Sequence, residues 1–108
     1  MIKRATSTSL AAAILALGVR AVVAQDVPTL NVEPLCKAEA KQAAGLAENC
    51  MNDQKQARED LAKQWAQFTP ASRKSCLQLV TGIPGIESYV ELLTCLQMKQ
   101  EVRELPKQ

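Results

Sequence analysis

The sequence predicts an all-α fold, a small disulfide-linked bundle of three to four short helices. Segments rich in Ala, Lys, Glu and Gln, which are strong helix formers, place their apolar residues at spacings of three and four. No stretch alternates apolar and polar residues in the manner of a strand. The chain of 108 residues also contains four cysteines, an even set that favours disulfides in a small exported protein.

Residues 1–24 are expected to be a signal peptide rather than part of the fold. A short positive start precedes the apolar run 10–19, which is shorter than the about 20 residues of a membrane-spanning helix. Val22 and Ala24 supply the small residues needed for cleavage before Gln25. We therefore expect a periplasmic or secreted protein with no stable membrane insertion after signal cleavage.

Residues 25–32 are expected to form a flexible N-terminal arm, because they contain a proline and show no periodicity, and residues 33–108 a single helical domain. Pro34 suits a first helical turn and opens a predicted helix over about 34–44. This helix carries few bulky apolar residues of its own. It therefore needs a tether, and Cys36 is placed to supply one.

A second helix is predicted over about 50–67. Gly45 costs about 1 kcal/mol relative to alanine inside a helix, and Asn49, Asn52 and Asp53 offer caps beyond it. These residues favour a break between Gly45 and Asn52. A helix that continues through Gly45 stays open as the alternative.

The third and fourth helices have recognisable starts. Thr69 is a predicted cap followed by proline at the first helical position, which opens a short helix that ends near Gly82. Ser88 and Glu91 have the spacing of a capping box, in which the serine oxygen and the glutamate carboxylate each satisfy a backbone amide. The fourth helix then runs to about Leu105.

The predicted core groups the chain's three aromatic residues with leucines at helical spacing: Leu61, Trp65, Phe68, Tyr89, Leu93 and Leu96. Aromatic residues also anchor interfaces, but Trp65 and Phe68 lie at helical spacing from Leu61 on one apolar helical stripe, which favours a core role. Met51 and Met98 are interpreted as core filling rather than copper ligands, since two isolated methionines without histidine make a poor site.

The four cysteines are predicted to form two disulfides, Cys50 with Cys95 and Cys36 with Cys76. A helix rises about 1.5 Å per residue. If the third helix descends along the second and the fourth helix continues downward, Cys95 comes level with Cys50. A first helix that folds back at Gly45 then lifts Cys36 to the level of Cys76. The pairing Cys36 with Cys95 and Cys50 with Cys76 would indicate a different layout of helices.

The composition excludes most familiar catalytic designs. The chain has no histidine, no glycine-rich phosphate loop, no EF-hand loop and no C-x2-C pair. We therefore expect no enzyme activity, no cofactor and no metal site, and the cysteine spacings in particular disfavour a four-thiolate zinc site. A catalytic thiol would be Cys76, which follows the basic residues Arg73 and Lys74.

The charge balance argues against a nucleic-acid partner. Cleavage after residue 24 removes three basic residues and leaves 10 basic residues against 11 acidic ones. A nucleic-acid binder carries a basic excess, and so does a protein that adheres to anionic lipid. An envelope protein is the candidate partner, and the sequence leaves the oligomeric state open.

The segment from the second cysteine onward resembles a group of small exported four-cysteine helical proteins of alphaproteobacteria. The resemblance covers about half of the chain and rests on residues 88–98 together with Cys50, Ala57, Arg58, Leu61, Trp65, Phe68, Arg73 and Cys76. It implies an exported, cysteine-linked helical domain. No activity is attached to that group, so the resemblance implies no catalytic residues.

Three function classes follow from these observations. The leading one is a non-catalytic envelope protein with a binding or structural role. The second is a periplasmic acid-stress chaperone, in which protonation of the 11 carboxylates would expose apolar surface. The third is a thiol-disulfide redox protein, which the cysteine spacing disfavours.

Overall fold

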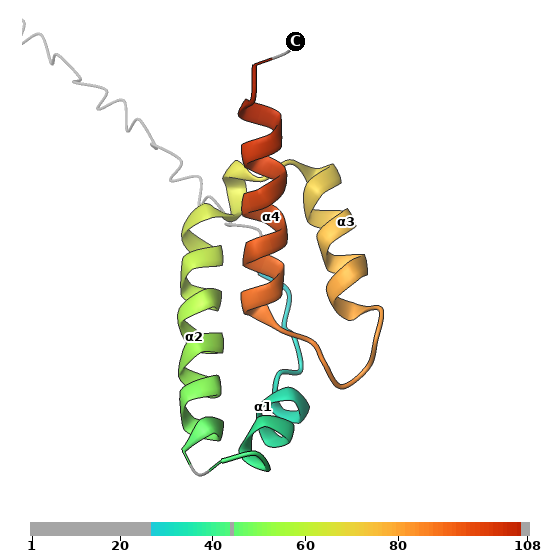
Figure 1. The fold of residues 1–108 in the computed structure, drawn as a ribbon. Coiled ribbons are helices and arrows are strands. Elements are labelled where there is room, and N and C mark those ends of the chain that lie inside the picture. The colour runs from blue at the N-terminus through green and yellow to red at the C-terminus, as the bar shows by residue number, and fades with distance from the viewer. Residues whose placement is uncertain (1–26, 44, 107–108) are drawn as a thin grey trace, which may run out of the picture.

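The computed structural model describes residues 27–43 and 45–106, and these residues form helices without a strand (Figure 1). The helices of this described part are α1 (Glu33–Ala40), α2 (Leu46–Gln64), α3 (Pro70–Thr81) and α4 (Tyr89–Glu104). A short 3-10 turn, η1 (Trp65–Gln67), follows α2. The predicted all-α, disulfide-linked bundle is confirmed. The expected signal peptide lies outside the described residues.

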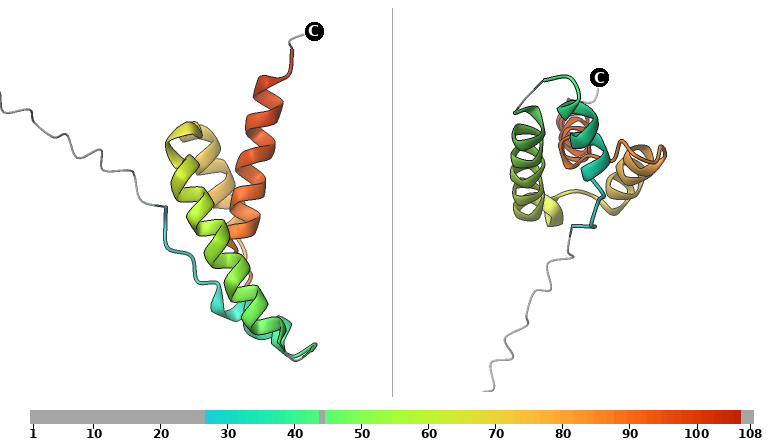
Figure 2. Two further views of the ribbon diagram at one scale, coloured as in Figure 1. Left: turned by 90° about the vertical axis from the view of Figure 1, so that its left-hand side faces the viewer. Right: turned by 90° about the horizontal axis from the view of Figure 1, so that it is seen from below.

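Helix α4 is the centre of the bundle. It lies between α2 and α3 and packs against both, whereas α1 packs only against α2 among the helices (Figure 1). Helices α2 and α4 run in the same direction and α3 runs against them, as Figures 1 and 2 show. The molecule thus consists of two helical hairpins, α1–α2 and α3–α4, joined through the turn η1.

The break between α1 and α2 falls at Gly45, as the sequence predicts. Gly45 has a φ of +85°, a left-handed conformation that residues with a Cβ rarely adopt. The chain reverses there, and α2 begins at the next residue. The predicted capping role of Asn49, Asn52 and Asp53 is wrong, because all three residues lie inside α2.

The loop 82–88 reverses the chain again, after the reversals at Gly45 and at η1. Gly85, in the middle of this loop, has a φ of +89° and allows the sharp turn. Helix α4 therefore ascends antiparallel to α3 (Figure 1). The prediction that the fourth helix continues downward is wrong, and this direction changes the pairing of the cysteines.

The core lies where α2, η1, α3 and α4 meet. Its aromatic residues Trp65, Phe68 and Tyr89 are 5%, 3% and 5% exposed, and its fully buried side chains are Leu61, Cys76, Leu92 and Leu96. Leu93 is half-buried and packs against this cluster. Among the predicted core residues Leu93 is therefore the peripheral one, and its neighbour Leu92 takes the central place.

The N-terminal segment 27–32 belongs to the core, and the expectation of a flexible arm is wrong for these residues. Val27, Leu30 and Val32 are buried in the same cluster as the aromatic residues. The Leu30 amide donates a hydrogen bond of 2.8 Å to the hydroxyl of Tyr89. An extended segment buries side chains without helical periodicity, so the periodicity test used on the sequence does not detect it.

No helix of the described residues is both long enough and apolar enough to cross a membrane.

Candidate functional site

All four cysteines form disulfides, but the predicted pairing is wrong. Cys36 is bonded to Cys50 and Cys76 to Cys95, with Cα to Cα distances of 5.4 and 5.8 Å. Each disulfide therefore closes one hairpin. Because α4 ascends beside α3, Cys95 comes level with Cys76 rather than with Cys50. Cys36 does tether α1, as expected, to the facing turn of α2.

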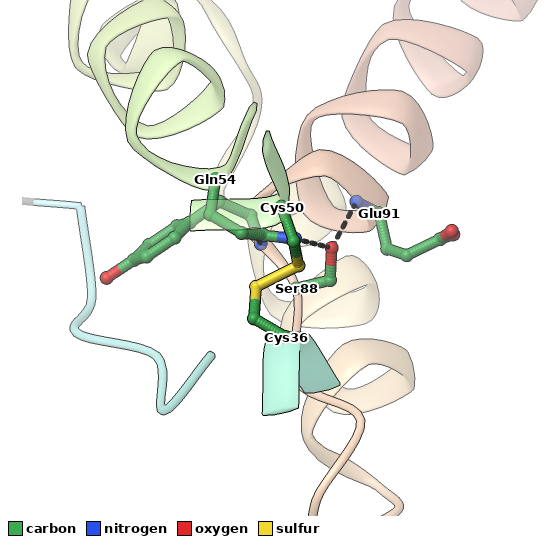
Figure 3. The surroundings of a disulfide bond; sticks show 6 residues. Cys36, Cys50, Gln54, Ser88 and Glu91 are labelled. Atoms are coloured by element: carbon green, nitrogen blue, oxygen red, sulfur yellow. Dashed lines mark hydrogen bonds between the residues drawn. A yellow bond between two sulfur atoms is a disulfide. The ribbon is translucent and has the colours of Figure 1, made fainter. Parts of the chain in front are cut away.

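A buried polar cluster fastens the start of α4 to α2. The Gln54 side chain donates a hydrogen bond of 2.8 Å from Nε2 to the Ser88 Oγ, and its Oε1 accepts one of 2.6 Å from the Tyr89 amide. Gln54 and Ser88 are 4% and 2% exposed. Figure 3 shows this cluster directly beside the disulfide between Cys36 and Cys50.

Only one half of the predicted capping box forms. Ser88 Oγ accepts a hydrogen bond of 3.3 Å from the Glu91 amide, so Ser88 caps α4 as Thr69 caps α3. The Glu91 carboxylate points away from Ser88 (Figure 3) and makes no bond to it. Gln54, a residue of another helix, accepts a hydrogen bond from the amide of Tyr89, the first residue of α4. Glu91 does not complete the capping box and is exposed at the surface.

A groove of about 630 Å³ lies beside this polar cluster, open to solvent. It is formed where α1, the first half of α2, the end of α3, the loop 82–88 and the first turns of α4 meet, at the lower end of the bundle in Figure 1. Its apolar lining consists of Leu35, Leu79, Val80, Ile86 and Val90. One cysteine of each disulfide, Cys50 and Cys95, also lines it.

The polar lining of this groove is acidic. The carboxyl residues Glu39 of α1, Asp53 of α2 and Glu91 of α4 border it, together with Gln54 and Ser88. Among the described residues that line the groove there is no lysine or arginine. The groove therefore combines an apolar surface with three negative charges from three different helices.

A second groove, also of about 630 Å³, has the opposite charge. It runs between the N-terminal segment and α3, and its lining includes Trp65, Leu77, Arg73 and Lys74. The Arg73 guanidinium lies over the Trp65 ring, 5.4 Å from its centroid. At this distance a guanidinium is attracted to the face of the ring, which gives Arg73 a place in the packing of the core.

The other candidates from the sequence are Cys76, Met51 and Met98, and the structure does not bring them together into one site. Cys76 is bonded to Cys95 and its side chain is 0% exposed. Met51 and Met98 are 41% and 61% exposed on different helices, so their interpretation as core filling is wrong. The described part of the chain contains no group of three or more cysteine, aspartate or glutamate residues arranged to hold a metal ion.

Sequence reasoning missed both Gln54 and the acidic groove. Gln54 was detectable, because it is a polar residue on the apolar stripe of α2 and a buried amide needs partners. The groove had no such signal, since its carboxylates come from helices whose relative positions the sequence does not state.

Comparison with known proteins adds no relative, since no protein-family model, curated protein or solved structure matches this chain.

Proposed function

We propose that this chain is a non-catalytic exported protein, periplasmic or secreted, that binds another macromolecule of the cell envelope through the acidic groove. The observation that carries the proposal is the groove itself, an open apolar cavity of about 630 Å³ whose walls come from both hairpins. A cavity of this size with few polar groups is typical of ligand sites. The two disulfides hold its walls in place, because Cys50 and Cys95 are part of them.

The chemistry of the groove supports binding over catalysis. Its serine oxygen already accepts two hydrogen bonds as the cap of α4, and its two cysteines are oxidised. The polar groups that remain at the surface are carboxylates, which attract a ligand by charge. We therefore assign the groove no covalent step.

Export from the cytoplasm is the second part of the proposal. Disulfides form and persist mainly in oxidising compartments such as the periplasm and the exterior of the cell. Both disulfides of this chain are internal to the bundle, and residues 1–24 have the pattern of a signal peptide. Together these features support a periplasmic or secreted protein.

Site-specific photo-crosslinking in intact cells tests the proposed function. A photoreactive amino acid is placed at Ile86 or Leu79, which are 51% and 70% exposed beside the groove. The matched control carries it at Glu59, an exposed position of α2 that does not line the groove. Discrete adducts from the two groove positions and none from Glu59 support the proposal. Adducts of equal yield at all three positions, or at none, contradict it.

The acid-stress chaperone is the second candidate function, and one contact favours it. The Asn31 amide donates a hydrogen bond of 2.8 Å to the carboxylate of Glu87, which fastens the apolar N-terminal segment onto the loop 82–88. Release of the segment would uncover the side chains of Val27, Leu30 and Val32, which are buried in the core. Loss of helicity and binding of a hydrophobic dye at about pH 2 to 3, with suppression of client aggregation, would support this function. Unchanged helicity there would contradict it.

A further inference from the structure

Among the described residues, the three carboxyl residues of the acidic groove have no partner in an ion pair. Glu39 is half-buried, and Asp53 and Glu91 are exposed at the rim. In the described part of the chain, no lysine or arginine forms an ion pair with any of the three. Since they come from α1, α2 and α4, the fold brings them together around one cavity. They are not the solvated face of a single helix.

The second groove shows that this negative charge is specific to the first. Both grooves have a volume of about 630 Å³ and both contain leucine side chains. The described residues of the second groove include Arg73 and Lys74 but no carboxylate. The linings of the two grooves therefore carry opposite formal charge, and charge complementarity favours a ligand for the first groove that is both apolar and cationic.

Apolar surface also continues beyond the cavity. Leu79, Ile86 and Val90 at its edge are 70%, 51% and 39% exposed, and the adjoining loop residue Ile83 is 61% exposed. A small ligand inside the cavity would leave much of this surface in water. A polypeptide laid across the groove covers it, in the way that an amphipathic segment places its apolar face into a groove of its partner.

We infer that the acidic groove binds an amphipathic, basic segment of a partner protein. The apolar side chains of that segment enter the cavity between Leu79 and Val90, and its lysine or arginine residues pair with Glu39, Asp53 and Glu91. This inference rests on the proposed binding function and adds to it the chemistry of the partner.

Isothermal titration calorimetry with synthetic peptides tests the inference on the oxidised protein. The probe is a peptide of about 14 residues in which leucine recurs at spacings of three and four and lysine fills the other positions. One control peptide has every lysine replaced by glutamate, and the other has every leucine replaced by serine. We expect saturable one-to-one binding of the first peptide, about tenfold or more tighter than either control, and weaker binding as salt is added.

Two matched triple variants locate the interaction. Neutralising the groove with Glu39→Gln, Asp53→Asn and Glu91→Gln should weaken binding about tenfold, the combined effect of three solvent-accessible ion pairs. The control variant carries Glu59→Gln, Glu101→Gln and Glu104→Gln, which change the net charge equally at exposed residues outside the groove. Its affinity should stay within about twofold of the parent. Leu79→Ser tests the apolar contribution and should also weaken binding.

Each contrary result overturns the inference. Equal binding of the glutamate peptide, or an unchanged affinity of the groove variant, removes the role of charge. Equal weakening by both triple variants shows that net charge acts rather than the groove. A dimer that excludes the peptide, detected by sedimentation, identifies a second copy as the occupant. If cross-links form at Ile86 and Leu79 but the peptide does not bind, the inference fails while the proposed function stands.

Discussion

The two hairpins of this protein are each closed by one disulfide, yet the two disulfides have different surroundings. Cys76 is fully buried within the hydrophobic core, and Cys95 packs against it. Cys36 and Cys50 are buried too, but they lie outside that core cluster, and Cys36 is the buried residue of α1. The α3–α4 disulfide therefore reinforces packing that already exists, whereas the α1–α2 disulfide replaces packing that α1 lacks.

Truncation of a side chain should cause the largest difference in unfolding free energy between the core and the α1–α2 hairpin. Trp65→Ala removes a large buried side chain next to α3 and α4 and should lower the free energy of unfolding by about 3 to 5 kcal/mol. The matched control is Met51→Ala on the α1–α2 hairpin, a residue that is 41% exposed, and it should cost less than about 1 kcal/mol. Urea denaturation measures both. Equal losses of stability in the two variants would contradict the location of the core around Trp65.

Removal of each disulfide sharpens the comparison. The sequence separations of 14 and 19 residues are close, so loop-closure entropy alone predicts a similar effect of about 3 kcal/mol for each bond. The variant Cys76→Ala, Cys95→Ala should show the full loss. In Cys36→Ala, Cys50→Ala, α1 unfolds locally and leaves the core intact, so the stability of the core should change by less than about 1 kcal/mol.

Amide hydrogen exchange distinguishes these two disulfide variants. Removal of the bond between Cys36 and Cys50 should abolish protection in α1 and leave the amides of α4 protected. Protection lost throughout the bundle of that variant would show that α1 belongs to the same cooperative unit as the core.

The contact of the N-terminal segment with Tyr89 should have an intermediate effect. Tyr89→Phe keeps the ring but leaves the buried Leu30 amide without its acceptor, which should cost about 1 to 3 kcal/mol. Thr29, an exposed residue of the same segment, offers a control, since Thr29→Val removes a hydroxyl without that contact. An unchanged denaturation midpoint of Tyr89→Phe would contradict the packing of the segment into the core.

A single substitution in the turn between α1 and α2 should have a smaller effect than the loss of the Tyr89 hydroxyl. Gly45→Ala introduces a Cβ at a φ of +85° without a steric contact, so only backbone strain of about 1 to 2 kcal/mol results. Gly45→Asn should restore part of the loss, because asparagine tolerates this conformation. The thermal midpoints of the two variants test this order. A midpoint of Gly45→Ala at or above that of the parent would show that the left-handed turn is absent.

The sequence predicted those features that local chemistry determines. Thr69 with Pro70 and Ser88 mark the starts of α3 and α4, Gly45 marks the break before α2, and the helical spacing of Leu61 and Trp65 indicates a buried stripe. Each of these signals depends on residues only a few positions apart. They are therefore readable without knowledge of the tertiary structure.

The pairing of the cysteines and the position of the groove could not be predicted from the sequence, for a physical reason. Periodicity states which side of a helix is buried, but it does not state whether the next helix ascends or descends. The turn at Gly85 sends α4 upward, and this single direction decides that Cys95 meets Cys76. It also places Glu91 near Asp53, so the acidic groove depends on the same reversal.

Tryptic peptide mapping without reduction tests the two-hairpin arrangement most directly. No lysine or arginine lies between Cys76 and Cys95, so trypsin leaves both in one peptide, residues 75–99. With the pairing of the structure, this peptide is released alone, two hydrogen atoms lighter than its reduced form. Peptide 42–55 is then linked to the peptide that ends at Lys37. A single species in which disulfides join all three peptides would contradict the hairpin pairing and, with it, the upward course of α4.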